Sequence, residues 1–253
     1  MAKVISVINQ KGGVGKSTTA HSLGCGLKQK GYKVLLIDLD AQSNLSYIMD
    51  LENVNNSILD VLLGLSKIED VIHKNELCDL IPSNIRLSGA DIFLSDTGKE
   101  YKLKEALNEI KDSYDFIVID TPPALGILTV NALTASDYAI IPAGADILSL
   151  QGIGQLYQTI EAVVKYTNSD LEILGILITR YNSRTILSRD VTEMLVETAE
   201  NLNTKVFDAK IREAVAIKES QISKMDIFSY DPKSNVAGDY NEFVEEVIRG
   251  VDK

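Results

Sequence analysis

A run of glycines, lysines and hydroxyl residues near the amino terminus has the composition of a phosphate-binding loop: Lys11, Gly12, Gly13, Val14, Gly15, Lys16, Ser17 and Thr18. An apolar segment (residues 4–8) precedes it, and a helix-like stretch follows. Glycines let backbone N–H groups turn toward phosphate oxygens, and a helix amino terminus adds partial positive charge. In such a loop Lys16 reaches the β- and γ-phosphates, and the Ser17 hydroxyl binds Mg²⁺. The alternative, a glycine-rich turn with solvated lysines, is disfavoured by this strand–loop–helix context.

The front of the loop departs from the usual pattern. Gln10 stands where a glycine is expected, five residues before Gly15, and a second lysine, Lys11, follows it. Lys16 already serves the phosphates of its own chain, so Lys11 is better placed to reach the nucleotide of a neighbouring subunit. Lys11 and Lys16 are therefore both candidate catalytic cations.

Two other apolar segments end in aspartates. Residues 34–37 run into Asp38 and Asp40, and residues 116–119 run into Asp120. Ligands of open α/β sheets bind beyond the carboxyl ends of the strands, so these carboxylates are expected beside the loop. Asp120 best fits the carboxylate that serves Mg²⁺, with Asp38 supporting the metal, and Asp40 is the candidate that orients the attacking water. The alternative role for each is a turn or helix-cap residue.

The elements that must position these residues alternate along the chain. Short segments rich in Val and Ile predict strands buried on both faces, at residues 4–8, 34–37, 116–119, 138–141 and 173–178. Amphipathic spacing predicts helices around residues 103–110, 191–198 and 239–251. Strands that alternate with helices predict an α/β fold, a mostly parallel central sheet with helices on both faces.

Composition narrows the class of protein. The 253 residues contain no repeat or linker, which predicts one domain over residues 1–253, and the loop begins too early to leave room for an N-terminal helix-turn-helix domain. A net charge of −11 argues against constitutive coating of nucleic acid. No signal peptide or long apolar run is evident, and the two distant cysteines, Cys25 and Cys78, predict free thiols. We therefore expect a cytoplasmic protein.

The loop and the two aspartate motifs resemble those of the ParA/MinD superfamily of P-loop ATPases with a deviant Walker A motif. Segments 81–90, 131–137, 181–185 and 230–234 resemble the ParA/Soj partition branch, and the similarity runs from residue 3 to about residue 249. The resemblance implies ATP and Mg²⁺ as cofactors and hydrolysis of ATP to ADP and phosphate. It also implies an ATP-bound homodimer in which Lys11 of each subunit reaches the other's phosphates. That dimer would bind non-specific double-stranded DNA, associate with the nucleoid, and release DNA when a ParB-like partner stimulates hydrolysis.

The same resemblance marks departures at the adenine and DNA positions. Arg212 and Ala214 replace the family's Pro and Asn near adenine, so we expect contacts there mainly through the backbone. Ala216 replaces one arginine implicated in DNA binding, whereas Arg184 matches another.

The charge distribution bears on DNA binding. Residues 176–224 carry eight cations and seven anions, whereas the rest of the chain carries 17 cations and 29 anions. This least acidic region makes Arg184, Arg189 and Lys218 the candidate DNA-binding residues. The alternative is a solvated surface of mixed charge.

Two rival functions share this chemistry. A ParA-like ATPase that positions a protein cargo would use the same residues. A MinD-like membrane cycle would need a basic amphipathic C-terminal helix, whereas the tail here is acidic, with Glu245, Glu246 and Asp252. We therefore expect a plasmid or chromosome partition ATPase that does not bind a membrane.

Overall fold

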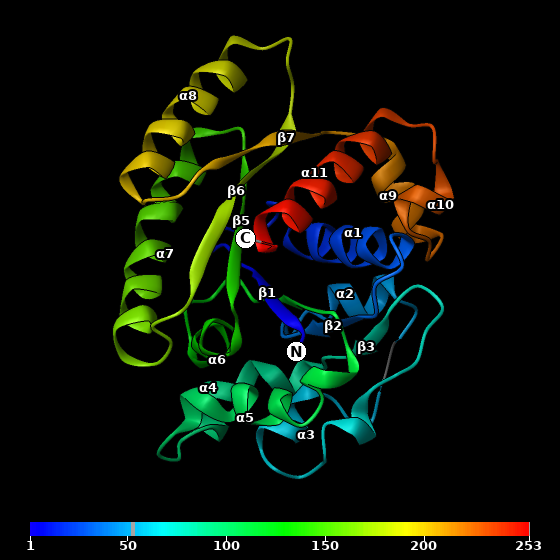
Figure 1. Cartoon of the computed structure of the whole chain (residues 1–253), viewed down its shortest axis with the longest axis vertical. Coiled ribbons are helices and arrows are strands. Elements are labelled where there is room, and N and C mark those ends of the chain that lie inside the picture. The colour runs from blue at the N-terminus through cyan, green and yellow to red at the C-terminus, as the bar shows by residue number, and fades with distance from the viewer. Residues whose placement is uncertain (52–53, 253) are drawn as a thin grey trace.

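The computed structural model describes residues 1–51 and 54–252, and within them seven strands form one sheet (Figure 1). Every strand is parallel to its neighbours, and the order is β3-β2-β4-β1-β5-β6-β7. The strands are β1 Lys3–Val7, β2 Val34–Asp38, β3 Asp79–Ile81, β4 Phe116–Asp120, β5 Tyr138–Gly144, β6 Glu172–Tyr181 and β7 Val206–Arg212. The predicted parallel α/β fold is thereby confirmed.

Helices cover both faces of the sheet (Figure 1). One face packs against α1 Lys16–Gln29, α2 Asn44–Ile48, α10 Ile227–Tyr230 and α11 Asn235–Val251, with α9 Val215–Ile222 beside them. The other face packs against α3 Ile58–Leu62, α4 Ala90–Phe93, α5 Lys102–Asn108, α6 Ile127–Ala135, α7 Ile147–Tyr166 and α8 Ile186–Asn201. Short 3₁₀ turns lie at Glu69–Val71, Ile85–Gly89, Lys99–Tyr101 and Lys111–Ser113.

Strand β4 shows why the central segments are apolar throughout. Phe116 and Val118 pack with α1 and α11, whereas Ile117 and Ile119 pack with the helices of the opposite face. Successive side chains of a strand point to opposite faces, so both sets must be apolar when both faces are covered. All five residues of β4 are buried.

The two edge strands were not predicted from the sequence. β3 is only three residues long, too short to stand out as an apolar run. β7 alternates instead, with Phe207, Ala209 and Ile211 buried and with Asp208 exposed. An edge strand covered mainly on one face has this period of two, which a search for continuous apolar runs does not detect. Cys25 and Cys78, expected as free thiols, are free and buried.

Helices α1 and α11 approach each other closely at Gly26. A Cβ added there would lie 2.6 Å from Cγ2 of Val244 and 3.3 Å from Cζ of Phe228. Real Cβ atoms do not come that close, so the packing of α11 on α1 requires a glycine at this position. Gly238, also helical, is exposed, and a Cβ added there would meet no atom within 4 Å.

We expect Gly26→Ala to lower the free energy of unfolding by about 1–2 kcal/mol, because overpacking outweighs the better helix propensity of alanine. Gly238→Ala is the matched control and should raise the free energy of unfolding by up to about 1 kcal/mol, since only propensity changes. Urea denaturation of both variants measures the difference. Adding Val244→Ala should recover part of the loss at Gly26. Equal stabilisation by both alanines would contradict the close packing.

Candidate nucleotide-binding site

The predicted site residues meet at the carboxyl edge of the sheet because the strands are parallel and in register. Asp120 of β4 pairs in register with Val7 of β1 on one side and with Asp38 of β2 on the other. The loop after β1 therefore starts level with both aspartates. Chain segments more than 100 residues apart are brought together by strand order alone.

The loop is held by the side chain of Asn9, which precedes it, and by the side chain of Thr179 from β6. Asn9 donates from Nδ2 to the carbonyl of Pro142 over 2.6 Å, and its Oδ1 accepts the Lys11 N–H over 2.9 Å. The Thr179 hydroxyl donates to the carbonyl of Val14 over 2.9 Å. These bonds fix a loop whose glycines at 13 and 15 have φ values of +74° and +87°, which residues with a side chain rarely adopt.

Helix α1 begins at Lys16, within the loop segment, and no side chain caps its amino terminus. Its N-cap is Gly15, and its first turn contains no acidic residue. The N–H groups at this end therefore keep the partial positive charge that binds phosphate. The buried Lys16 ammonium donates to the Lys11 carbonyl over 3.2 Å. Burial lowers the pKa of Lys16, and the nearby charges of Asp120 and Asp40 oppose that shift.

Asp120 is fully buried, yet neither of its carboxylate oxygens has a hydrogen-bond partner of ordinary geometry among the described residues. Burial raises the pKa of Asp120 well above its usual value, the charge of Asp38 raises it further, and Ser17 and Lys16 act in the opposite direction. A buried carboxylate without partners is costly. Its two oxygens and the Ser17 hydroxyl fit a Mg²⁺ ion that takes its remaining ligands from phosphate and water.

Asp38 differs from Asp120 because its oxygens already accept hydrogen bonds. Oδ1 accepts the Asp40 N–H over 3.0 Å, and Oδ2 accepts the N–H and the hydroxyl of Ser46, both over 2.8 Å. Burial nevertheless raises the pKa of Asp38 to about 6. These bonds fix the turn that carries Asp40. Asp40 is buried, accepts the Gln42 N–H over 3.0 Å and lines the cavity described next.

A cavity of about 650 Å³ opens over the loop. Its walls include seven of the eight predicted loop residues (12–18), Asp40, and both predicted adenine-site residues, Arg212 and Ala214. Lys218, predicted as a DNA contact, also lines this cavity. Residues that were not predicted from the sequence complete the lining, among them Gln42, Tyr47, Pro123, Arg180, Gln221 and Tyr240.

The segment after β7 is anchored to the loop and to α11. Gln221 donates from Nε2 to the Thr18 hydroxyl over 2.9 Å. Asp239 of α11 accepts two bonds from the Arg212 guanidinium, over 2.6 and 2.7 Å, and a third from the Arg212 N–H over 3.1 Å.

Arg184 and Arg189 lie away from the cavity. Arg184 is exposed in the loop before α8, and Arg189 is exposed on α8 itself. Figure 1 shows α8 and the helix of Lys218, α9, on opposite sides of β7. A single chain therefore does not gather the three predicted DNA contacts into one cluster.

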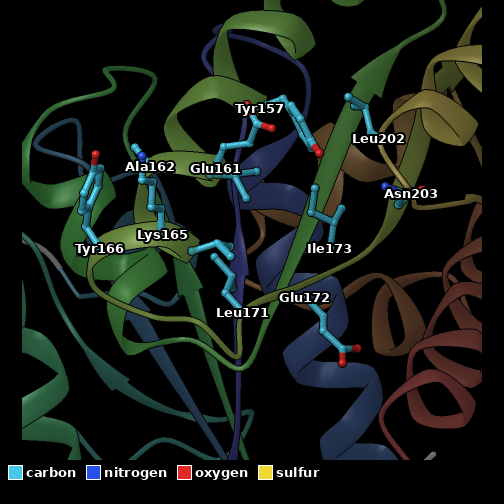
Figure 2. Close-up of a pocket in the computed structure, with 12 residues that line it drawn as sticks. Tyr157, Glu161, Ala162, Lys165, Tyr166, Leu171, Glu172, Ile173, Leu202 and Asn203 are labelled. Atoms are coloured by element: carbon cyan, nitrogen blue, oxygen red, sulfur yellow. The ribbon is translucent and has the colours of Figure 1, made fainter.

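A second cavity, of about 850 Å³, lies at the other edge of the sheet (Figure 2). Its lining comes from α7, from the start of β6 at Glu172 and from Leu202 and Asn203 after α8. In a parallel sheet this amino-terminal edge is opposite the edge where Asp38 and Asp120 meet. The cavity is larger than the first, but it contains none of the predicted site residues.

Lys11 bonds within its own chain. Its ammonium pairs with Asp146 over 2.6 Å and donates to the Ser149 hydroxyl over 3.4 Å. Asp146 is also the N-cap of α7, where it accepts the Ser149 N–H over 3.1 Å. Partial burial raises the pKa of Asp146, but the hydrogen bond and charge of Lys11 outweigh this effect, so the pKa lies below its usual value.

Comparison with known proteins places this site in a family. A family model described as an AAA domain matches residues 2–173. The sporulation initiation inhibitor protein Soj of Bacillus subtilis is 40% identical over 98% of each chain, and the chromosome partitioning protein ParA of Caulobacter vibrioides is 38% identical over 97% of this chain and 94% of its own. A structure named cobyrinic acid a,c-diamide synthase, from Mycobacterium smegmatis with bound ATP analogue and magnesium, superposes with a TM-score of 0.88. It is 35% identical and is matched over 100% of this chain and 97% of its own.

We expect Asp146→Ala to lower the free energy of unfolding by about 1 kcal/mol, because α7 loses its N-cap. Asp146→Asn keeps an oxygen that accepts the Ser149 N–H but removes the charge that pairs with Lys11, so it should stay near the wild-type value. Thermal and urea unfolding of the two variants measure this. A loss as large in the asparagine variant as in the alanine variant would show that the ion pair, rather than the cap, stabilises this corner.

Proposed function

The chain belongs to the ParA/Soj family of ATPases, and from that premise we propose that it is a partition ATPase whose ATP-bound dimer holds DNA. Residues 1–253 form a single ATPase domain. The observation that carries the proposal is Asp120, a buried carboxylate with no hydrogen-bond partner of ordinary geometry among the described residues, set beside Lys16, Ser17 and an uncapped helix amino terminus. This arrangement is electrostatically incomplete until a magnesium nucleotide occupies it.

Each residue of the site has a role in ATP binding. The triphosphate lies on Lys11 to Thr18, with the N–H groups of the loop and Lys16 facing its oxygens. Ser17 and Asp120 hold Mg²⁺, and Asp38 supports the metal by fixing the adjoining turn. The bound metal neutralises phosphate charge. The described residues offer no group of three or more His, Cys, Asp and Glu side chains for a metal, which suits an ion that borrows ligands from phosphate.

Hydrolysis depends on a water and on a second subunit. Asp40 borders the cavity and orients the attacking water. Lys11 stands at the mouth of the loop and reaches the phosphates of the partner's nucleotide, so ATP joins two copies of the chain. A ParB-like partner stimulates hydrolysis and returns the dimer to monomers.

DNA binding follows from dimerisation. Arg184, Arg189 and Lys218 supply three cations per chain, and α9, which carries Lys218, lies on the other side of β7 from α8, which carries Arg189 (Figure 1). A dimer doubles the number of these contacts and presents both sets to one duplex. Binding is strengthened in this way without any new kind of contact. The ATP-bound protein is therefore nucleoid-associated, and the monomer is not.

The rival functions predict different partners. A MinD-like cycle would use the apolar face of α11, but Tyr240, Phe243 and Val247 of that face are buried against the sheet and α1. No helix in the described part of the chain is both long enough and apolar enough to cross a membrane. A protein cargo would leave the ATPase site unchanged and remove the need for DNA. A diamide synthase would couple ATP turnover to cobyrinic acid.

We expect binding to a random-sequence duplex with a non-hydrolysable ATP analogue and not with ADP, weakening as salt rises. Arg184→Ala should reduce the slope of log affinity against log salt by about 2 for a dimer, since two phosphate contacts are lost. Fluorescence anisotropy across a salt series measures both. Arg249→Ala, which removes an exposed arginine of α11, is the matched control and should bind as the wild type does.

Three outcomes would contradict the DNA proposal. Equal binding with ADP would remove the nucleotide gate. ATP-driven dimers that bind no DNA would favour a protein cargo. Turnover stimulated by cobyrinic acid, and not by DNA with a partner, would favour the synthase.

We expect Asp40→Asn to lower kcat for ATP hydrolysis by about 100-fold or more, a typical contribution of a residue that assists proton transfer or positions water. The asparagine oxygen can still accept the Gln42 N–H, so the turn should persist and ATP affinity should change by less than about threefold. Phosphate release and fluorescent-nucleotide binding measure the two quantities. Unchanged kcat in Asp40→Asn would exclude a role for this carboxylate in hydrolysis.

A further inference from the structure

Arg180, near the end of β6, has an unusual backbone conformation. Its φ is +53°, in the left-handed region that residues with a side chain rarely adopt. The register between β6 and β7 also shifts between Ile178 and Tyr181. Such irregularities redirect a side chain, and they are frequent beside functional sites.

The side chain of Arg180 points to the phosphate loop. Its Nη2 atom lies 3.9 Å from the position that a Cβ on Gly13 would occupy. Arg180 also lines the nucleotide cavity, together with loop residues 12–18. The preceding residue, Thr179, is bonded to the Val14 carbonyl, so the end of β6 is fixed against the loop.

The guanidinium has no partner within residues 1–51 and 54–252 that would explain this placement. Among the described residues, no hydrogen bond or ion pair involves the Arg180 side chain, whereas Arg86 and Arg212 are each paired with a carboxylate. Arg180 shares its cavity with Lys16, and like charges repel. A cation with a strained backbone and no partner among the described residues, beside a phosphate loop, is therefore positioned to bind an anionic ligand.

We propose that Arg180 is a further phosphate-binding residue of this site, which raises affinity for the triphosphate more than for the diphosphate. A guanidinium offers a planar set of donors that matches phosphate oxygens. ATP carries more negative charge than ADP, so a cation at the front of the loop favours ATP. The inference rests on the proposed ATPase function and adds a cation that the family resemblance does not supply.

The test compares Arg180→Gly with Arg180→Lys. Glycine adopts a positive φ without strain, so Arg180→Gly should fold at least as stably as the wild type while losing the guanidinium. We expect its ATP affinity to fall by about 10-fold, with a change of less than about threefold for ADP. Arg180→Lys should recover part of the ATP affinity because it restores the charge. Fluorescent ATP and ADP analogues report binding, and thermal unfolding reports folding.

Wild-type affinity for ATP in a folded Arg180→Gly variant would overturn the assignment, as would equal losses for ATP and ADP. Lys16→Ala, which should lose both nucleotides, separates this failure from failure of the proposed function. If the wild-type chain binds neither nucleotide, the ATPase proposal itself fails.

Mixed dimers show whether Arg180 contacts the phosphates of the nucleotide bound to its own subunit or of the nucleotide bound to the partner. Arg180→Gly chains are mixed with Asp40→Ala chains, so that one site of each mixed dimer keeps Asp40 but lacks its own Arg180. Turnover above that of either variant alone would place Arg180 on the partner's phosphates. No gain would place it on the phosphates of its own subunit. Wild-type turnover by Arg180→Gly alone, at ATP concentrations below the wild-type KM, would overturn both.

Discussion

The structure depends on a constraint at the carboxyl edge of the sheet. There Asp120 is buried beside a second buried aspartate, Asp38, and has no hydrogen-bond partner of ordinary geometry in the described part of the chain. Two neighbouring carboxylates removed from water repel each other, and burial alone disfavours their charge. The covered parallel sheet holds them in register nonetheless. The amino end of α1 and the Lys16 ammonium supply the opposing charge. The fold therefore maintains an electrostatic arrangement that only a cationic and anionic ligand pair, such as magnesium and a triphosphate, completes.

That constraint explains the different treatment of the two aspartates. Asp38 is satisfied by Asp40 and Ser46 and so acts as a fixed part of the turn, whereas Asp120 keeps both oxygens available. A ligand that binds only the folded chain adds its binding free energy to stability. Nucleotide binding should thus stabilise the very edge that is least satisfied without it.

Central elements were predictable because their signal is local. The strands buried on both faces form continuous apolar runs, and the loop and its aspartates follow those runs within a few residues. β3 and β7 were not predicted because these edge strands lack a continuous apolar run. The roles of three other residues were not predicted because each one's partner is distant in the chain and meets it only through the strand order. The separations are 135 residues for Asp146 and Lys11, 27 for Asp239 and Arg212, and 203 for Gln221 and Thr18. Arg180 carries no motif, and only its φ and its proximity to Gly13 single it out.

The proposed ATP-bound dimer requires Lys11 to leave its partner in its own chain. In the single chain it pairs with Asp146, but the lysine and aspartate side chains are 29% and 45% exposed, respectively. An ion pair this accessible to solvent contributes only about 0–1 kcal/mol. A partner's triphosphate has several negative charges in a less solvated setting, where each interaction with Lys11 is stronger. The intrachain contact therefore holds Lys11 beside Asp146 in the single chain, and it is weak enough to be exchanged for the contact that the proposed dimer requires.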